Sequence, residues 1–177
     1  MSIKIYKENR GLFTFMKTVQ MTIVEVPVKP YVKAYLEKNY GNPVNLSSVR
    51  GLNNFFKLLL EKNYFRNDKQ INLNGYTSTV NIVITRDVFY RHGWYLSKTS
   101  IVSFNGMVEA LIKNRIRDMV YINVIHGGNK IARSIRLALK ELSIDEDELS
   151  FDAVKKDIQR HTSVKVNKKI GVNVPKN

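Results

Sequence analysis

The spacing of apolar residues changes near residue 97, and this change constrains the fold more than any other feature of the sequence. Alternation of apolar and polar residues, which is typical of a strand, occurs in residues 19–26 and again from Val80 to Ile84. Beyond residue 97 every apolar pattern has the spacing of a helix. The sequence therefore predicts an α+β fold, with an α+β unit over residues 1–96, a helical unit over residues 97–161 and a flexible basic tail over residues 162–177.

The N-terminal unit is predicted to begin with a strand and two helices. Pro27 ends the strand over residues 19–26 or confines it to a sheet edge, because proline has no amide hydrogen to donate. Pro30 suits the first position of a helix for the same reason, and Gly41 ends that helix. A second helix starts from a cap at Ser47 or Ser48. Its apolar face comprises Leu52, Phe55, Phe56, Leu59 and Leu60.

The pair Asn74-Gly75 predicts a β-hairpin. A two-residue type I′ turn needs positive φ at both central residues, and asparagine and glycine tolerate that conformation well. The return strand carries Val80, Ile82 and Ile84 on one side. Strand, helix, helix and hairpin also follow one another in winged helices, which is one alternative for this unit. Residues 86–100 are expected to be a connector with a break at Gly93.

Three helices are predicted in the C-terminal unit. The first starts near residue 97 and ends at His126-Gly127-Gly128-Asn129, with Lys113 and Arg117 off its apolar face. The second covers residues 129–142, and the third covers residues 151–161 with Ser150 as its cap. The apolar faces comprise Ile101, Phe104, Val108, Leu111, Ile112, Met119 and Ile122 in the first helix, Ile131, Ile135, Ala138, Leu139 and Leu142 in the second, and Phe151, Val154 and Ile158 in the third.

An acidic run from Asp145 to Glu148 lies between the last two helices. Ser143-Ile144-Asp145-Glu146 has the spacing of a capping box, in which Ser143 and Glu146 bond each other's backbone N–H groups. Acidic side chains are favoured at a helix N-terminus by the helix dipole. We therefore expect this run to initiate a helix, because it lacks the spacing and the central glycine of an EF-hand calcium loop.

The charge of the chain points to a class of partner. There are 29 Lys and Arg against 15 Asp and Glu, a formal net charge of +14 in 177 residues. A surplus of this size opposes folding by self-repulsion and indicates a polyanionic partner, of which duplex DNA is our first expectation. The absence of cysteine excludes disulfides, thiolate zinc sites and cysteine nucleophiles.

No set of catalytic or metal-binding residues accompanies the charge. His92, His126 and His161 lie far apart in the sequence, without partners at metal-ligand spacing. Asp87 could orient His92 as a base, yet no nucleophile or second acid lies nearby. No phosphate-binding glycine motif is present. We therefore expect a protein that is not an enzyme and needs no cofactor or metal.

A basic stripe on the helix over residues 129–142 is the first candidate site. Its apolar residues gather on one side, and Lys130, Arg133, Arg136 and Lys140 gather on the other. Such a stripe suits a phosphate backbone, because lysine and arginine displace condensed counterions. A charged face that is merely solvated is the alternative.

The last helix is the second candidate, with Lys155, Lys156, Gln159 and Arg160 on its exposed side. Three short helices with tight joints have the outline of a helix-turn-helix domain, in which glutamine can read adenine and arginine can read guanine. A plain helical bundle has the same outline.

Residues 100–161 also resemble small proteins encoded by tailed phages and integrated mobile elements. The resemblance rests on Phe104-Asn105, Glu109 and Arg115, followed by Glu146-Asp147, Phe151-Asp152, Lys155-Lys156-Asp157 and Arg160. Ile158-Gln159 stands where those proteins have an aromatic residue before the arginine. The resemblance implies a phage or mobile-element setting and assigns no active site.

Together these patterns predict a non-enzymatic DNA-binding protein that regulates or assists a phage or mobile element. The alternative is a structural or assembly protein of a virion, with a basic surface toward packaged DNA. A nuclease or a ribosome-associated RNA binder is a third alternative. Tyr90 and Trp94 beside Arg91 could also form a stacking surface for unpaired bases. No apolar run is long enough for a signal peptide or a membrane span, so we expect a cytoplasmic or virion location. Self-association, or assembly with other proteins, is left open.

Overall fold

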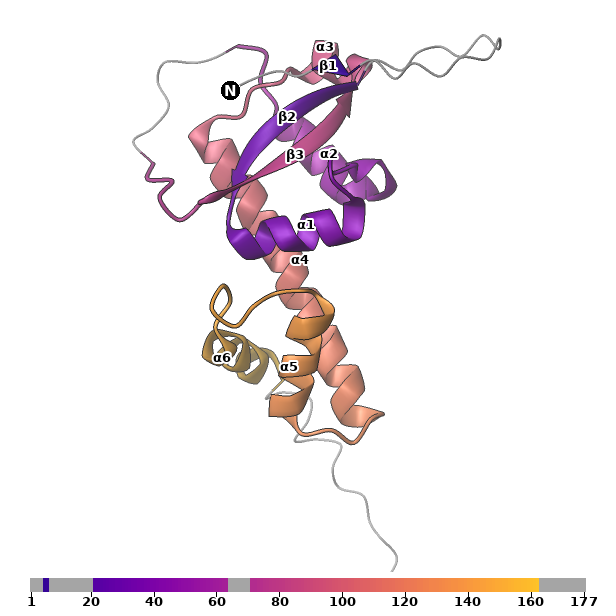
Figure 1. Ribbon diagram of the computed structural model, residues 1–177, viewed down its shortest axis with the longest axis vertical. Helices are drawn as coiled ribbons and strands as arrows, with labels where there is room; N and C mark the ends of the chain where they lie inside the picture. The colour runs from indigo at the N-terminus through magenta and orange to yellow at the C-terminus, as the bar shows by residue number, and fades with distance from the viewer. Residues whose placement is uncertain (1–4, 7–20, 64–70, 163–177) are drawn as a thin grey trace, which may run out of the picture. The chain divides into compact units, whose positions relative to one another are not determined.

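The computed structural model describes residues 5–6, 21–63 and 71–162, and it divides the chain into two compact units (Figure 1). The first unit is Met1–Leu111 and the second is Ile112–Asn177. A long helix, α4 (Lys98–Ile125), starts at the predicted boundary, and the division lies inside this helix. The predicted α+β class is confirmed. The basic tail predicted over residues 162–177 lies, apart from its first residue, outside the described residues.

The first unit contains an antiparallel sheet of three strands in the order β1-β2-β3. The strands are β1 (Ile5–Tyr6), β2 (Met21–Val28) and β3 (Ser78–Thr85). β2 and β3 pair over their whole length, from Met21 opposite Thr85 to Val28 opposite Ser78. Because successive side chains of a strand point to opposite faces, the alternation buries one face of this pair. That face comprises Val24, Val26, Val28, Val80, Ile82 and Ile84.

The predicted hairpin around Asn74-Gly75 is wrong. Residues 71–73 do not form a strand, and β3 pairs with β2, which lies about 50 residues earlier in the chain. A turn is present, since the Tyr76 amide donates to the Leu73 carbonyl at 2.9 Å. Neither Asn74 nor Gly75 has the positive φ of a type I′ turn. The reason is burial: residues 71–73 have no buried side chain, whereas β2 presents three buried valines to pair with β3.

Pro27 lies inside β2, which is the central strand of the sheet, so the prediction that Pro27 ends its strand or confines it to a sheet edge is wrong. β1 pairs only with Met21 and Thr22, which leaves this side of β2 without a described strand at Pro27. The Pro27 carbonyl accepts a hydrogen bond from Nδ2 of Asn105, at 3.0 Å. A side chain from α4 thus replaces the missing strand neighbour.

Two helices and a 3₁₀ turn follow β2. The predicted helix is confirmed as α1 (Pro30–Tyr40), which ends at Gly41 with φ of 82°. Asn45 caps a 3₁₀ turn, η1 (Leu46–Ser48), and α2 (Arg50–Leu59) follows it. The predicted cap at Ser47 or Ser48 is therefore wrong, because both serines belong to η1. Of the predicted apolar face of α2, Leu52, Phe56 and Leu60 are buried, and Phe55 and Leu59 are half-buried.

The predicted connector over residues 86–100 contains a short helix, α3 (Arg86–His92). Thr85 caps it by accepting a hydrogen bond from the Val88 amide at 3.4 Å. Gly93 ends it with φ of 102°, and a Cβ at this position would collide with the Glu61 carbonyl. Glycine is therefore needed here both for its backbone conformation and for its small size.

The second unit packs α5 (Ile131–Glu141) and α6 (Phe151–Thr162) with residues 112–125 of α4. The buried side of this part of α4 follows Ile112, Ile116 and Val120. Each step of four residues rotates the buried side by about 40°, since a helix has 3.6 residues per turn. Ile122 therefore lies on the outer side and is exposed, which corrects its predicted core position.

The other predicted core residues of this unit divide into two groups. Ile135, Ala138, Leu139, Leu142, Val154 and Ile158 are buried as predicted. Ile131 is exposed because it begins α5, where no preceding turn covers it, and Met119 and Phe151 are half-buried. The predicted stop after α4 is confirmed, with Gly128 at φ of 62°.

The predicted capping box at Ser143 is wrong, because Ser143 ends α5 instead of starting a helix. Its φ is 56°, and its amide donates to the Lys140 carbonyl while the Ile144 amide donates to the Leu139 carbonyl. These two bonds form a Schellman motif, and Ile144 is buried beside it. The acidic run lies in a turn, and α6 starts later, where Ser150 accepts from the Ala153 amide as predicted.

Candidate nucleic-acid interface

The basic stripe of α5 is present as predicted. Lys130, Arg133, Arg136 and Lys140 are all exposed, on the side of the helix opposite Ile135 and Leu139. Ser134 is buried, and its hydroxyl donates to the Lys130 carbonyl at 3.2 Å, which holds the first turn of α5. The buried residues thus fix the rotation of α5 about its axis, and this rotation points the four cations outward.

Arg136 is the stripe residue with the most contacts. Its Nε lies 3.7 Å from Oε1 of Glu146, and its guanidinium lies 5.2 Å from the centre of the Phe151 ring. Both side chains of the ion pair are more than half exposed, and pairs of this kind contribute about 0–1 kcal/mol. A phosphate could therefore replace Glu146 at little cost. Among the described residues, Lys130, Arg133 and Lys140 have no ion-pair partner.

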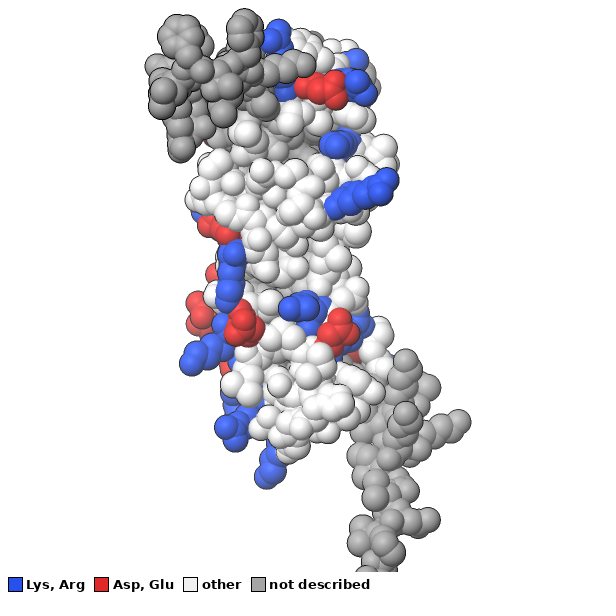
Figure 2. Space-filling model, turned by 90° about the vertical axis from the view of Figure 1, so that its right-hand side faces the viewer, with Lys and Arg blue, Asp and Glu red and all other residues white. Residues whose placement is uncertain are grey.

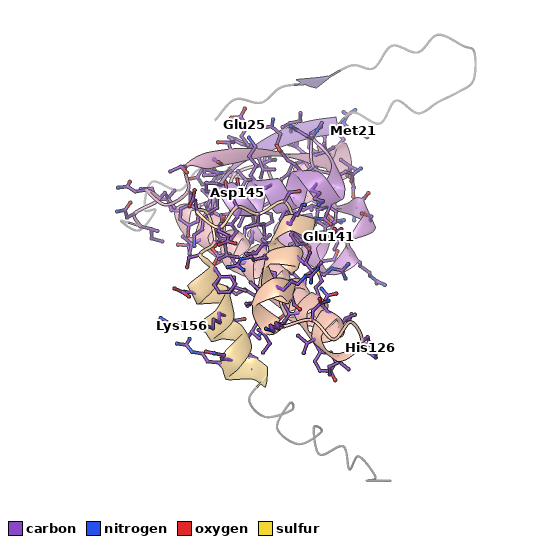
Figure 3. All side chains as sticks on the ribbon, turned by 60° about the horizontal axis from the view of Figure 1, so that its bottom comes forward. Met21, Glu25, His126, Glu141, Asp145 and Lys156 are labelled. Carbon is purple, nitrogen blue, oxygen red and sulfur yellow. The ribbon has the colours of Figure 1, made fainter. Side chains whose placement is uncertain are left out.

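The second candidate set lies on α6, where Lys155, Lys156, Gln159 and Arg160 are all exposed as predicted. Figure 3 labels Lys156 on this helix and Asp145 in the connection from α5. Asp152 is exposed on the same side of α6 and reduces its positive charge.

A different side of α6 is tied to α4. Asp157 lies 3.7 Å from Nε of Arg117, and both side chains are about one quarter exposed. Arg117, which the sequence places off the apolar face of its helix, thus has a structural role. His161 lies 3.6 Å from the other Asp157 oxygen, Oδ1, and Nδ1 of its ring is 2.8 Å from the Asp157 carbonyl.

Acidic residues limit the extent of the basic surface in the second unit. Residues 112–162 contain ten basic and eight acidic side chains, so their net charge is only +2. Asp145, Glu146, Asp147 and Glu148 are all exposed between α5 and α6. Partial burial and the neighbouring charge of Asp145 raise the pKa of Glu148. On the face drawn in Figure 2, basic and acidic side chains lie interspersed. The candidate interface is therefore a local stripe and not a wholly basic face.

The α3 segment does not assemble a catalytic group. Asp87 forms an ion pair with Arg91, with Oδ1 and Nε 2.9 Å apart, so its carboxylate is engaged by arginine and not by His92. Tyr90 is exposed, and the Arg86 guanidinium lies 5.4 Å from its ring centre. An exposed aromatic ring beside an arginine has the chemistry of a small stacking surface. Stacking of unpaired bases on this segment therefore stays a prediction.

Sequence reasoning missed a polar cluster in the first unit that joins α4 to the start of α1. Oδ1 of Asn105 accepts from the Lys29 amide at 3.2 Å, and its Nδ2 donates to the Pro27 and Ile101 carbonyls at 3.0 and 2.9 Å. Glu109 lies 2.6 Å from Nζ of Lys29. A polar residue within an apolar helix face is a signal that could have indicated this cluster. Asn105 is fully buried, and its bonds show that it is structural.

This cluster also changes the pKa of Lys29 and of Tyr31, whose ring centre lies 5.9 Å from Nζ of Lys29. Burial alone would lower the pKa of Lys29, but the hydrogen bond and negative charge of Glu109 outweigh it and raise that pKa. Burial, with the charge of Glu109, raises the pKa of Tyr31 to about 12. Lys29 therefore stays charged and Tyr31 stays neutral over the physiological range.

Within the described ranges, no group of three or more His, Asp or Glu side chains could hold a metal ion. None of the helices in the same ranges has both the length and the apolar character that a membrane span requires. Comparisons with protein-family models, with curated proteins and with solved structures found no match. The resemblance to phage and mobile-element proteins therefore stays a prediction, as do the roles of the two basic helices.

Proposed function

We propose that this protein is a non-enzymatic DNA-binding protein that contacts the phosphate backbone of duplex DNA through α5. The observation that carries the proposal is the separation of the two sides of this helix. Lys130, Arg133 and Lys140 are exposed without ion-pair partners among the described residues, and Ile135 and Leu139 hold the opposite side in the core.

The length of the stripe suits several phosphates. Ten residues separate Lys130 from Lys140, which corresponds to about 15 Å along a helix axis. Phosphates of one DNA strand are spaced about 3.4 Å along the duplex axis, so the stripe spans about four of them. Arg136 joins the others by exchanging its weak ion pair with Glu146 for a phosphate.

We propose different roles for the two basic helices. α5 positions the protein on the backbone, because the four side chains of its stripe, Lys130, Arg133, Arg136 and Lys140, are all cations. α6 supplies Gln159 and Arg160, which can bond base edges, together with Lys155 and Lys156. In this proposal the protein regulates or assists a phage or mobile element, which rests on the resemblance of residues 100–161.

Salt titration of duplex binding tests the proposal. The full chain should bind a fluorescent duplex, and the logarithm of the affinity should fall linearly with the logarithm of the salt concentration. Replacing Arg133 and Lys140 with Ala should weaken binding to all duplexes alike and lower the slope by about two, at about 0.9 per lost phosphate contact.

A matched control variant removes the same charge from the first unit, where Arg50 and Lys62 are also exposed. Its slope should stay near that of the parent protein. If both double variants lost the same duplex affinity, net charge alone would drive binding. Absence of duplex binding by the full chain at about 50 mM salt would refute the proposal outright. A selection from random duplexes that returned no preferred sequence would remove the proposed groove-reading role of Gln159 and Arg160.

The second candidate function is a structural or assembly protein of a virion. It is favoured by apolar side chains that are exposed near the end of α4, namely Tyr121, Ile122 and Ile125. Exposed apolar groups of this kind mark protein contacts. Co-purification in an assembly with other virion proteins, without affinity for free duplex, would support this function over the first.

A further inference from the structure

The exposed side of α3 carries an aromatic ring among charged side chains. α3 directly follows β3 in the first unit (Figure 1). Val88 is buried, and Phe89 and His92 are half-buried, so these three residues form the side that faces the protein. At 3.6 residues per turn, the other four residues share the opposite side. All four are exposed, and they are Arg86, Asp87, Tyr90 and Arg91.

Both ends of α3 are fixed by hydrogen bonds. The Thr85 side chain caps its start, and Gly93 ends it. Directly after Gly93, the Trp94 and Tyr95 amides donate to the Glu61 carbonyl at 3.1 and 3.0 Å. The Glu61 amide donates in turn to the Tyr95 carbonyl at 2.8 Å. A surface held in this way is formed before a ligand arrives, so binding costs little ordering of the backbone.

Tyr90 is the centre of this surface. Its side chain is 60% exposed, and the Phe89 ring packs edge-on against it with 5.4 Å between the ring centres. The cation beside the ring is Arg86, 5.4 Å from the ring centre, and not Arg91, which is paired with Asp87 at 2.9 Å. Arg86 has no ion-pair partner among the described residues, so its charge is available to a phosphate.

We propose that the exposed side of α3 binds single-stranded DNA, with one unpaired base stacked on Tyr90 and the adjoining phosphates bound by Arg86 and Arg91. Any base can stack on an aromatic ring, because every base has a π face. A single exposed ring offers too little area for a stable protein partner, which buries about 800 Å² on each side. One ring is sufficient for one base. The choice of DNA over RNA rests on the partner proposed for α5.

Asp87 limits the strength of this site. Its carboxylate partly neutralises Arg91 and repels phosphate. Both side chains of the pair are more than half exposed, so phosphate can replace the carboxylate at little cost. Asp87→Asn should therefore strengthen the binding of single-stranded DNA by about threefold. A variant that bound single-stranded DNA more weakly would contradict the role of Arg91.

The test compares a strand that has bases with one that lacks them. It uses the full chain with Arg133 and Lys140 replaced by Ala, which removes two cations of α5 from the measured affinity. Fluorescence anisotropy measures binding of an oligothymidine of about 12 nucleotides and of an abasic chain of the same length, which keeps the phosphates. Oligothymidine should bind about tenfold more tightly, because only its bases can stack.

Tyr90→Leu should remove this preference for bases and leave the helical circular dichroism unchanged, because the ring is exposed. Tyr121→Leu is the matched control, since Tyr121 is an exposed tyrosine of α4, and it should keep the preference. In the chain with its α5 stripe intact, Tyr90→Leu should not change the affinity for duplex DNA, because paired bases stay inside the helical stack. Failure of the α5 proposal, a loss of duplex binding, is thus measured separately.

Equal affinity of the chain with Tyr90 for oligothymidine and for the abasic strand would overturn the proposal. A preference for bases that survives in Tyr90→Leu would overturn it too, because the bases would then stack elsewhere. Tighter binding of oligouridine than of oligothymidine would overturn the choice of DNA.

Discussion

Individual side chains, and not motifs, join β2, α1 and α4 in the first unit. Asn105 satisfies the Pro27 carbonyl and the Lys29 amide, and Glu109 pairs with the Lys29 side chain. Buried polar groups of this kind stabilise a fold only when each has its partner. No described buried side-chain nitrogen or oxygen lacks a hydrogen bond, so the cluster is complete.

Alkaline pH should loosen this cluster. The pKa of Lys29 is raised in the folded state, so its stabilisation is present below the ordinary lysine pKa of 10.5 and is lost as pH rises through the folded value. Tyr31 acts in the same direction: between the ordinary value of 10.0 and about 12 the unfolded chain releases a proton that the folded chain retains. We expect the free energy of unfolding to fall from pH 9 upward.

Urea titrations at increasing pH measure this effect, and Tyr31→Phe should make the decline shallower. Tyr90→Phe is the control, because Tyr90 is exposed and lies outside the cluster. If the free energy of unfolding of Tyr31→Phe fell with pH as steeply as that of the parent protein, Tyr31 would not contribute to the alkaline loss of stability.

At the scale of elements, the two sides of α5 have separate tasks. Leu139 is 2% exposed in the core, while Leu137 on the same helix is 41% exposed. Leu139→Ala should lower the free energy of unfolding by about 2–5 kcal/mol, because it removes buried methyl groups and leaves a cavity. Leu137→Ala makes the same chemical change with a much smaller effect. Urea unfolding measures the free energy of unfolding of both variants. If Leu137→Ala and Leu139→Ala lowered it by similar amounts, α5 would be rotated relative to this description.

Truncating Phe151 is expected to destabilise the fold less than truncating Leu139. Its ring is half-buried and supports the Arg136 guanidinium, so Phe151→Ala should destabilise less than a fully buried position would. The same variant frees Arg136 from one of its two contacts, so its DNA affinity should change little while its stability falls.

For the whole molecule, the distribution of charge matters more than its total. Residues outside the described ranges carry ten basic and two acidic side chains, which is more than half of the net charge of +14. A surplus of this size opposes the compact state through self-repulsion, and salt screens that repulsion with a Debye length of about 10 Å at 0.1 M.

We therefore expect opposite salt effects on folding and on DNA binding. The melting temperature should rise by a few degrees between low and moderate salt, because screening relieves repulsion in the folded chain. Over the same range the affinity for duplex DNA should fall. Sodium chloride and choline chloride should act alike if screening is the cause. A melting temperature that falls with both salts would contradict the self-repulsion argument.

The sequence by itself determined the features that depend on neighbours along the chain. The bounds of α1 follow from Pro30 and Gly41, the start of α6 follows from Ser150, and the basic stripe of α5 follows from 3.6-residue periodicity. Each of these depends on backbone sterics, a local hydrogen bond or helix geometry within a few residues. The α+β class could also be predicted, because the change from strand to helix spacing is a local pattern.

The tertiary structure alone decided which elements meet. β3 pairs with β2 and not with a hairpin partner, and Ile122 lies outside the core. Ser143 ends α5, although it was expected to start the next helix. In each case the local pattern allows more than one arrangement, and burial of side chains from distant segments selects one of them. The cluster of Lys29, Asn105 and Glu109 exists for the same reason, because residues about 80 positions apart become neighbours only after the chain has folded.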